Sequence, residues 1–225
     1  FRSAAALQAP RPAHRDRCYA SKPCPSRLQW KHRMITAADT EAYQRDGAVC
    51  LRNLFTSGQI ELLRAGLDSN LANPSPRSKV ASRPDDPGFF IEDFCNWQRI
   101  AEYKRFIFES PAAEIAGQLM GTKEVRLYHD HLLVKEPKTT ATTPWHQDQP
   151  YYNIDGFQNV SMWLPVDPVK VESTLKFVGS SHSGGWLMPR SFMSNEAKWF
   201  PEGTLKDLPD IDGNPDKYKD RKSVV

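Results

Sequence analysis

The sequence lacks the features that several protein classes require. It has no apolar run approaching the roughly 20 residues of a membrane span, no internal repeat, and no glycine-rich loop of the kind that binds phosphate. Its four cysteines, Cys18, Cys24, Cys50 and Cys95, have no close metal-type spacing, so we expect reduced, buried thiols rather than a disulfide framework. No serine or cysteine has recognisable triad partners, which leaves nucleophilic catalysis unsupported.

Basic charge is concentrated at one end of the chain. The net charge is +3, but residues 1–33 hold eight Lys/Arg and one Asp, a charge of +7, so residues 34–225 carry −4. A mildly acidic body disfavours a nucleic-acid partner, which usually needs a basic face. Residues 1–33 also contain four prolines. We expect a disordered leader there, either an organelle transit sequence or upstream sequence foreign to a cytoplasmic protein that starts at Met34.

From Met34 onward, the pattern predicts helices first. Ala48–Leu51, after the helix-ending Gly47, is a short apolar run typical of a buried strand. Asn73-Pro74 is expected to end the second helix. The helix starts are predicted by caps at Thr36 with Asp39, at Thr56 with Gln59, and at Ser110 with Pro111.

Strands are predicted to follow the helices. Within residues 125–134 the apolar residues alternate with period two, and this places His129 and His131 on one face. Residues 160–166 and 175–178 are expected to form further strands. Helices followed by antiparallel strands favour an α+β domain whose β half is a barrel or double sheet.

One short segment contains two residues of types that can bind a metal ion. His146 and Asp148 lie two residues apart, so on an extended chain both side chains project to the same side. An imidazole and a carboxylate on one face can fill two corners of an octahedral metal site, and a distant histidine would fill the third, as in non-haem Fe(II) oxygenases. By itself, His-x-Asp also fits a histidine that is hydrogen-bonded to a neighbouring carboxylate.

The surroundings of this tripeptide resemble the phytanoyl-CoA dioxygenase family, over roughly Met34 to Lys219. The resemblance implies a double-stranded β-helix, that is, a cupin-like jelly roll flanked by N-terminal helices. It also implies Fe(II) held by His146 and Asp148, with 2-oxoglutarate as co-substrate. The segments that carry the resemblance are Trp145–Tyr152, Val160–Asp167 and Leu175–His182.

Further site residues are expected around these two ligands. The resemblance implies that Tyr128 and Trp163 contact 2-oxoglutarate, although both could be packing residues. Gln149, Tyr151 and Tyr152 follow the ligand turn and could line a substrate pocket or simply pack at its rim. The implied reaction uses dioxygen to hydroxylate a small organic or acyl substrate and releases succinate and CO2. Neither the substrate nor the oligomeric state can be deduced from the sequence.

The C-terminal end departs from the family pattern. The family's distal histidine and its 2-oxoglutarate arginine follow a region that corresponds to Asp216–Lys219, yet here no histidine follows His182. We therefore expect residues 34–225 to be a partial domain that lacks its last core strands. His182 as the third ligand is a less favoured alternative, and Arg190 as the arginine has no support beyond being available.

Two other functions stay open. Without a distal ligand, the protein would be an inactive jelly-roll binding or scaffold protein. Alternatively, His129, His131 and Glu136 form a His-x-His-x4-Glu pattern that resembles a cupin metal motif. The simpler interpretation is that both histidines line the barrel interior or pack as neutral core residues.

Overall fold

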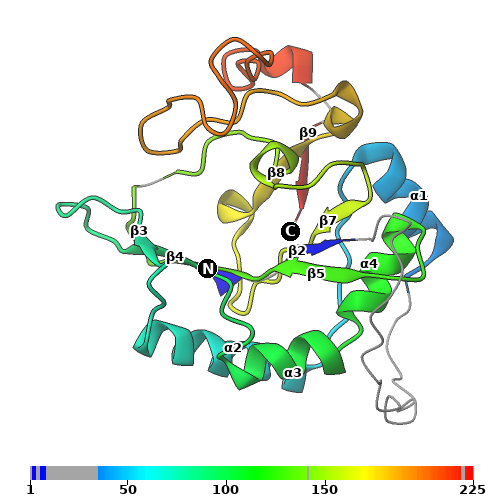
Figure 1. The fold of residues 1–225 in the computed structure, drawn as a ribbon, viewed down its shortest axis with the longest axis vertical. Helices are drawn as coiled ribbons and strands as arrows, with labels where there is room; N and C mark the ends of the chain where they lie inside the picture. The colour runs from blue at the N-terminus through cyan, green and yellow to red at the C-terminus, as the bar shows by residue number, and fades with distance from the viewer. Residues whose placement is uncertain (1, 4–5, 9–34, 141, 219–220, 225) are drawn as a thin grey trace, which may run out of the picture.

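The computed structural model describes residues 2–3, 6–8, 35–140, 142–218 and 221–224. It has the predicted α+β composition, with helices early in the chain and antiparallel sheets (Figure 1). In the described ranges, no helix is both long and apolar enough to cross a membrane. The α-helices are α1 (Ala37–Asp46), α2 (Ser57–Ala72), α3 (Ala101–Glu109) and α4 (Ala112–Met120).

The described strands form three sheets, with orders β1-β6-β4-β3, β5-β2-β7 and β8-β9. Their bounds are β1 Arg2–Ser3, β2 Ala6–Gln8, β3 Lys79–Val80, β4 Phe90–Phe94, β5 Arg126–His129, β6 His131–Lys135, β7 Asn159–Ser161, β8 Leu175–Val178 and β9 Arg221–Val224. Short 3-10 turns are η1 Gln149–Tyr151, η2 Val171–Ser173, η3 Ser181–Gly184 and η4 Pro215–Tyr218.

Both predicted capping boxes are present. The Thr36 hydroxyl accepts the Asp39 N–H (3.2 Å), and the Asp39 carboxylate accepts the Thr36 N–H (2.8 Å). Thr56 and Gln59 make the same reciprocal pair at 3.1 and 2.9 Å. Each box satisfies N–H groups that a helix start leaves without partners, which is why α1 and α2 begin where the sequence predicted.

Gly47 ends α1 in a left-handed conformation, with φ 79°. A Cβ at this position would collide with the imidazole of His182. The same turn is held by a hydrogen bond from the Ser180 N–H to the Asp46 carbonyl (2.8 Å) and by the His182 Nε2, 3.2 Å from the Gln44 carbonyl oxygen. The Gly-Ser-Ser-His turn therefore packs on the end of α1.

Two predicted strands differ from the structure. Ala48–Leu51 forms no strand. Val49 and Leu51 pack against the core, so the apolar run is explained by side-chain packing without ladder pairing. The strand predicted at residues 160–166 ends at Ser161, and Pro165 has no N–H with which to extend a ladder.

The cysteine prediction also needs correction. Cys50 and Cys95 lie on the surface and not in the core. Cys95 follows β4 with φ 58°, in a turn whose backbone is held by hydrogen bonds, so its position is set by the turn and not by thiol burial. Cys18 and Cys24 lie outside the described residues.

The first residues of the chain take part in the sheets. β1 pairs with β6, and β2 lies between β5 and β7. Both strands belong to residues 1–33, for which the sequence predicted no packed structure. The division of the chain at residue 33 and the jelly roll both stay predictions. The rest of the leader, residues 1, 4–5 and 9–33, lies outside the described residues.

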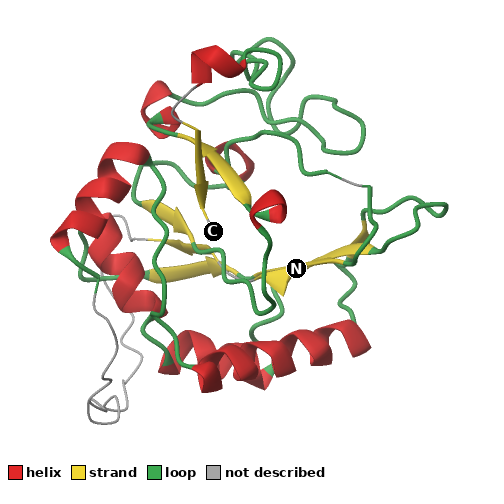
Figure 2. Ribbon diagram, turned by 180° about the vertical axis from the view of Figure 1, so that it is seen from behind, coloured by secondary structure: helices red, strands yellow, loops and turns green. Residues whose placement is uncertain are grey.

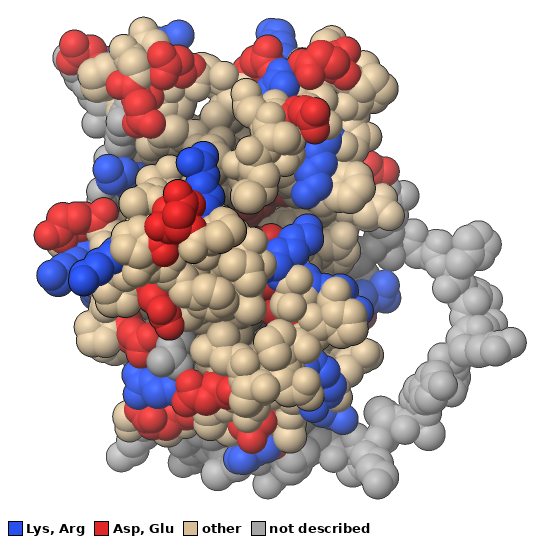
Figure 3. Space-filling view, turned by 90° about the vertical axis from the view of Figure 1, so that its left-hand side faces the viewer, with Lys and Arg blue, Asp and Glu red and all other residues tan. Residues whose placement is uncertain are grey.

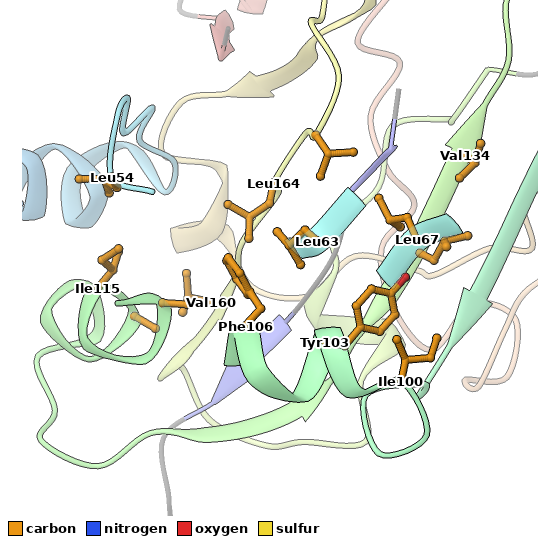
Figure 4. Packing of buried hydrophobic residues seen from close by; sticks show 14 of the residues in the cluster. Leu54, Leu63, Leu67, Ile100, Tyr103, Phe106, Ile115, Val134, Val160 and Leu164 are labelled. Atoms are coloured by element: carbon orange, nitrogen blue, oxygen red, sulfur yellow. The ribbon is translucent and has the colours of Figure 1, made fainter. Parts of the chain in front are cut away.

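Helices cover one side of the sheets, and long loops cover the other. Figures 1 and 2 show α2 and α3 side by side below the sheets, with the C-terminal loops above. The core lies on the helix side, where apolar side chains of α2, α3 and α4 meet those of the strands (Figure 4). The labelled members are Leu54, Leu63, Leu67, Ile100, Tyr103, Phe106, Ile115, Val134, Val160 and Leu164.

Asp130 separates β5 from β6, so one stretch of chain contributes to both larger sheets. Its side chain is 2% exposed. The carboxylate accepts the N–H groups of Asn96 (2.9 Å) and Trp97 (3.0 Å), and the Asp130 carbonyl accepts the Cys95 N–H (3.0 Å). These bonds satisfy a buried charge and fix the turn after β4 against the corner between the sheets.

A second buried carboxylate, Asp93, ties β4 to the end of α2. Its side chain is fully buried and accepts the Ser75 hydroxyl (2.5 Å), the Ser75 N–H (2.8 Å) and the Asn70 amide (2.8 Å). Arg99 lies 3.7 Å away. Burial acts to raise the pKa of Asp93, but the hydrogen bonds from Ser75 and Asn70 outweigh it and lower the pKa to about 2.

Gly47→Ala should lower the free energy of unfolding by about 2 kcal/mol, because the left-handed backbone costs an L-residue about 1–2 kcal/mol and the His182 ring must also move. Urea unfolding measures the change. Gly58→Ala is the matched control, since its Cβ would meet only the Thr56 hydroxyl at 3.9 Å. This second variant should be as stable as the wild type or up to about 1 kcal/mol more stable. Equal losses for both glycines would contradict the prediction.

Asp93→Asn should remove about 2–3 kcal/mol of stability at pH 7. The folded pKa of Asp93 is depressed, so its contribution is complete above the unfolded pKa of about 3.9 and is lost as pH falls towards 2. Urea unfolding at pH 7 and in steps from pH 5 to pH 2.5 should show the wild type and the variant converging at low pH. The exposed Asp85→Asn should change stability by less than about 0.5 kcal/mol at pH 7.

Candidate functional site

His146 and Asp148 lie in the irregular segment between β6 and η1, and their side chains meet. The Nε2 of His146 is 3.1 Å from Oδ1 of Asp148. The two side chains are 27% and 47% exposed, so the pair is open to small molecules from solvent. The imidazole and carboxylate thus meet as the His-x-Asp spacing suggested, but the segment is not a strand, and Asp148 has the dihedrals of a helical turn (φ −67°, ψ −43°) at the start of η1.

The tautomer of His146 follows from its other nitrogen. Nδ1 is 2.8 Å from the Pro144 carbonyl oxygen, and because a carbonyl can only accept, Nδ1 carries a proton. The remaining nitrogen, Nε2, points at the Asp148 carboxylate. A proton or a metal cation between Nε2 and Oδ1 satisfies both atoms. A backbone carbonyl that orients the far nitrogen is also the usual support for a metal-binding histidine.

The spacing of the two donor atoms fits one metal ion. Donors on neighbouring corners of an octahedral ion with bonds of about 2.1 Å lie about 3.0 Å apart. The observed separation is 3.1 Å. Nitrogen and oxygen donors together suit Fe(II). Across the described ranges, no group of three His, Cys, Asp or Glu side chains is placed to hold a metal ion.

The alternate residues of the segment point elsewhere and anchor it. The Trp145 indole N–H donates to the Asp212 carboxylate (3.1 Å). The Gln147 amide donates to the Gly185 carbonyl (3.1 Å) and accepts the Leu187 N–H (2.8 Å). The backbone that carries the two ligands is thereby fastened to the C-terminal loops.

The far carboxylate oxygen of Asp148 is also held. The Ser161 hydroxyl of β7 donates to Oδ2 (2.8 Å), and the Tyr152 hydroxyl lies 3.1 Å from the Ser161 oxygen. Tyr152 was predicted to line a substrate pocket; its hydroxyl belongs instead to the Asp148 network, and a substrate contact stays a prediction. Sequence reasoning missed Ser161, because an isolated serine 13 residues away carries no signal.

Ionisation within the pair follows from these contacts. Burial acts to lower the pKa of His146, but Asp148 outweighs it and raises the pKa. Burial acts to raise the pKa of Asp148, but hydrogen bonds from His146 and Ser161 lower it. Burial and the Asp148 charge raise the pKa of Tyr152, so its hydroxyl keeps its proton at neutral pH.

Aromatic rings surround the His146 imidazole. Its centroid is 6.0 Å from the Tyr151 ring, edge to face, and 4.8 Å from the Phe192 ring. The Tyr151 hydroxyl donates to the Arg190 carbonyl (2.7 Å) and accepts the Arg190 N–H (2.9 Å), which holds the loop that carries Phe192. Tyr151 therefore lies beside the candidate ligand His146, and its predicted substrate contact stays a prediction. Phe192, which is 46% exposed, is a neighbour that the sequence did not reveal.

The other predicted residues have clear partners within the protein. The Gln149 amide donates to the Ile154 carbonyl and accepts from Asn159, so it holds the turn to β7. The Tyr128 hydroxyl accepts the Asn153 N–H (3.1 Å), and its ring lies 5.4 Å from that of Tyr152. Trp163 is half-buried, two residues beyond Ser161. The 2-oxoglutarate contacts of Tyr128 and Trp163 and the substrate contact of Gln149 stay predictions.

The alternative ligands do not complete a three-residue site. The ring centroids of His131 and Phe94 are 3.9 Å apart, so the two rings stack. The carboxylate next to the His131 imidazole, at 3.5 Å, is that of Glu92 and not that of the predicted Glu136. Burial, followed by the nearby His131, lowers the pKa of His129. Since the described residues contain no three-ligand group, His129, His131 and Glu136 do not form one.

His182 and Arg190 are likewise committed to other contacts. His182 packs on Gly47 at the end of α1, and among the described residues it does not form a three-ligand group with the His146–Asp148 pair. The Arg190 guanidinium binds Glu202 and Asp207, each at 2.6 Å. It therefore orders the C-terminal loop.

Charged side chains of both signs are mixed on the face of the molecule that Figure 3 shows. Lys/Arg and Asp/Glu side chains are interspersed over the described part of the face in Figure 3. A groove of about 510 Å³ lies between the start of α2 and the end of α3, on the helix side of the sheets. None of the predicted site residues lines it, so we do not connect it with the metal-binding pair. Its lining includes Thr56, Gln59, Leu62, Arg105, Phe106 and Glu109.

Comparison with known proteins assigns the chain to a family. No curated protein and no solved structure matches the sequence. The sequence profile of phytanoyl-CoA dioxygenase (PhyH) matches residues 43–224. This span includes His146, Asp148 and every described strand except β1 and β2. Since the match extends over more than half of its length, the chain belongs to the phytanoyl-CoA dioxygenase family.

Proposed function

We propose that this protein is an Fe(II)- and 2-oxoglutarate-dependent dioxygenase that hydroxylates a small organic or acyl substrate. Membership of the family supports oxygenase activity of this general kind. The single observation that carries the proposal is the 3.1 Å approach of His146 Nε2 to Asp148 Oδ1, with Nδ1 held by the Pro144 carbonyl. The jelly-roll architecture is part of the proposal, and the antiparallel sheets are consistent with it.

In this proposal, His146 and Asp148 supply two ligands to the ion. Bound there, Fe(II) together with 2-oxoglutarate and dioxygen would supply the oxidation that places one oxygen atom in a substrate C–H bond and the other in succinate, with loss of CO2. The Pro144 carbonyl keeps the proton on Nδ1, so Nε2 is the nitrogen available to the ion.

The remaining side chains orient and shield this pair. The rings of Tyr151 and Phe192 lie beside the His146 imidazole and cover part of it. Gln147 and Trp145 hold the ligand backbone. Tyr128 and Trp163 are proposed to contact 2-oxoglutarate, and Gln149, Tyr151 and Tyr152 to border the substrate. Such positioning is the part of catalysis that a protein supplies when the ion and its co-substrate do the oxidation.

His146→Ala and Asp148→Ala should each abolish Fe(II)-dependent succinate formation from 2-oxoglutarate. Each should also weaken metal binding by more than the roughly 10- to 100-fold typical of losing an outer-shell partner. Succinate is measured by chromatography, and the affinity for Mn(II), a redox-stable substitute for Fe(II), by calorimetry. The reason is that each variant removes one of the two donor atoms that lie 3.1 Å apart.

His182→Ala is the matched control, because this imidazole packs on α1 and not on the site. It should lower stability and leave the Mn(II) affinity unchanged. Metal binding that survives His146→Ala but is lost in His131→Ala would favour a cupin-type metal enzyme instead. A folded wild type that binds Mn(II) but forms no succinate would favour an inactive binding or scaffold protein.

A further inference from the structure

The side chains of β7 that point away from the core both hold the ligand turn. Val160 is buried in the core, so Asn159 and Ser161, on either side of it in the strand, project to the opposite face. Asn159 donates to the Gln149 side-chain carbonyl (2.9 Å), and Ser161 donates to the Asp148 carboxylate (2.8 Å). A single three-residue strand therefore positions two consecutive residues of the turn.

The two carboxylate oxygens of Asp148 have different partners. Oδ1 faces the His146 nitrogen, and Oδ2 accepts the Ser161 hydroxyl. The terminal torsion of an aspartate is soft, and this side chain is 47% exposed, so its orientation depends on its hydrogen bonds. The hydrogen bond from Ser161 is what keeps Oδ1 turned towards His146.

Tyr152 fixes the serine in turn. A serine hydroxyl has one proton, which Ser161 donates to Asp148, so the Tyr152 hydroxyl, 3.1 Å away, must donate to the Ser161 oxygen. The Tyr152 ring lies 5.4 Å from the Tyr128 ring and 5.6 Å from the His129 ring, both on β5. The chain of contacts thus runs from β5 through Tyr152 and Ser161 to Asp148.

We propose that Ser161 and Tyr152 are positioning residues that set the orientation of the Asp148 carboxylate for metal binding. The inference rests on the proposed function, because it assigns these hydroxyls to the same metal-binding pair. Neither hydroxyl supplies a donor atom to the ion: Ser161 acts through Asp148, and Tyr152 acts through Ser161 and on the Asp148 carboxylate directly. Hydrogen-bond partners of this kind orient metal ligands and raise affinity without supplying a donor atom.

Ser161→Ala should weaken Mn(II) binding by about 10- to 100-fold, since the carboxylate loses its orienting partner. Ser161→Thr keeps the hydroxyl on a residue that suits a strand and should restore binding to within about 3-fold of the wild type. Tyr152→Phe removes the donor to Ser161 and the direct contact of this hydroxyl with Asp148, and should cost about 2- to 10-fold. Calorimetric titration of the full chain with Mn(II) measures all three.

Two controls separate positioning from a general loss of structure. Ser183→Ala removes a hydroxyl that donates to the Ser180 carbonyl (2.8 Å), outside the site, and should not change Mn(II) affinity. In the metal-free protein, the effects of Ser161→Ala and Asp148→Ala on urea unfolding should not be additive, because the double variant breaks the same hydrogen bond once.

The outcomes distinguish this inference from the proposed function. If the wild type binds Mn(II) through His146 while Ser161→Ala binds equally well, the positioning role is wrong and the metal site stands. If Ser161→Thr binds as poorly as Ser161→Ala, the effect is steric and the role of the hydroxyl is wrong. If the wild type binds no Mn(II), the proposed function fails, and the positioning role fails with it.

Discussion

The architecture around the site depends on a buried negative charge at the corner where the two larger sheets meet. Asp130 interrupts a continuous stretch of chain, so β5 belongs to one sheet and β6 to the other. Its carboxylate is satisfied by two backbone N–H groups from the turn after β4. Without such partners a buried carboxylate would be strongly unfavourable, so the turn and the corner can form only together.

The position of this corner decides which side chains of β6 face the core and which face the opposite side. Leu132 and Val134 point to the helices and the core, whereas His131 and Lys135 face the side that holds the ligand loop. The Lys135 amine donates to the Thr143 hydroxyl (3.4 Å), three residues before the candidate ligand His146. On β5, the rings of Tyr128 and His129 support Tyr152. One bent strand thus supports both ends of the segment that contains the candidate ligands.

Local signals in the sequence were sufficient for the features that depend on near neighbours. The capping boxes at Thr36 and Thr56 were predictable because both partners lie three residues apart. The His146–Asp148 pairing followed from a spacing of two. The absent strand at Ala48–Leu51 could not be foreseen, because a short apolar run does not reveal whether it will find a ladder partner.

Contacts between segments that are distant in the chain could not be predicted from the sequence. Ser161 on Asp148 and Phe192 on His146 depend on how separate loops fold over the sheets, and neither residue belongs to a pattern. The resemblance to the family carried the fold class and the ligand pair because whole segments were alike in order and spacing. It gave no information about the hydroxyl network, which is a property of this chain's own side chains.

The anchoring of Trp145 and Gln147 has an evolutionary consequence. Both side chains fasten the ligand backbone to loop residues between Gly185 and Asp212, a part of the chain with little regular structure. Surface loops accept substitutions and length changes more readily than core strands. Natural variation there, selected for a new substrate, would also shift the backbone beneath the two ligands. The geometry of the His146–Asp148 pair is therefore coupled to the structure of these loops.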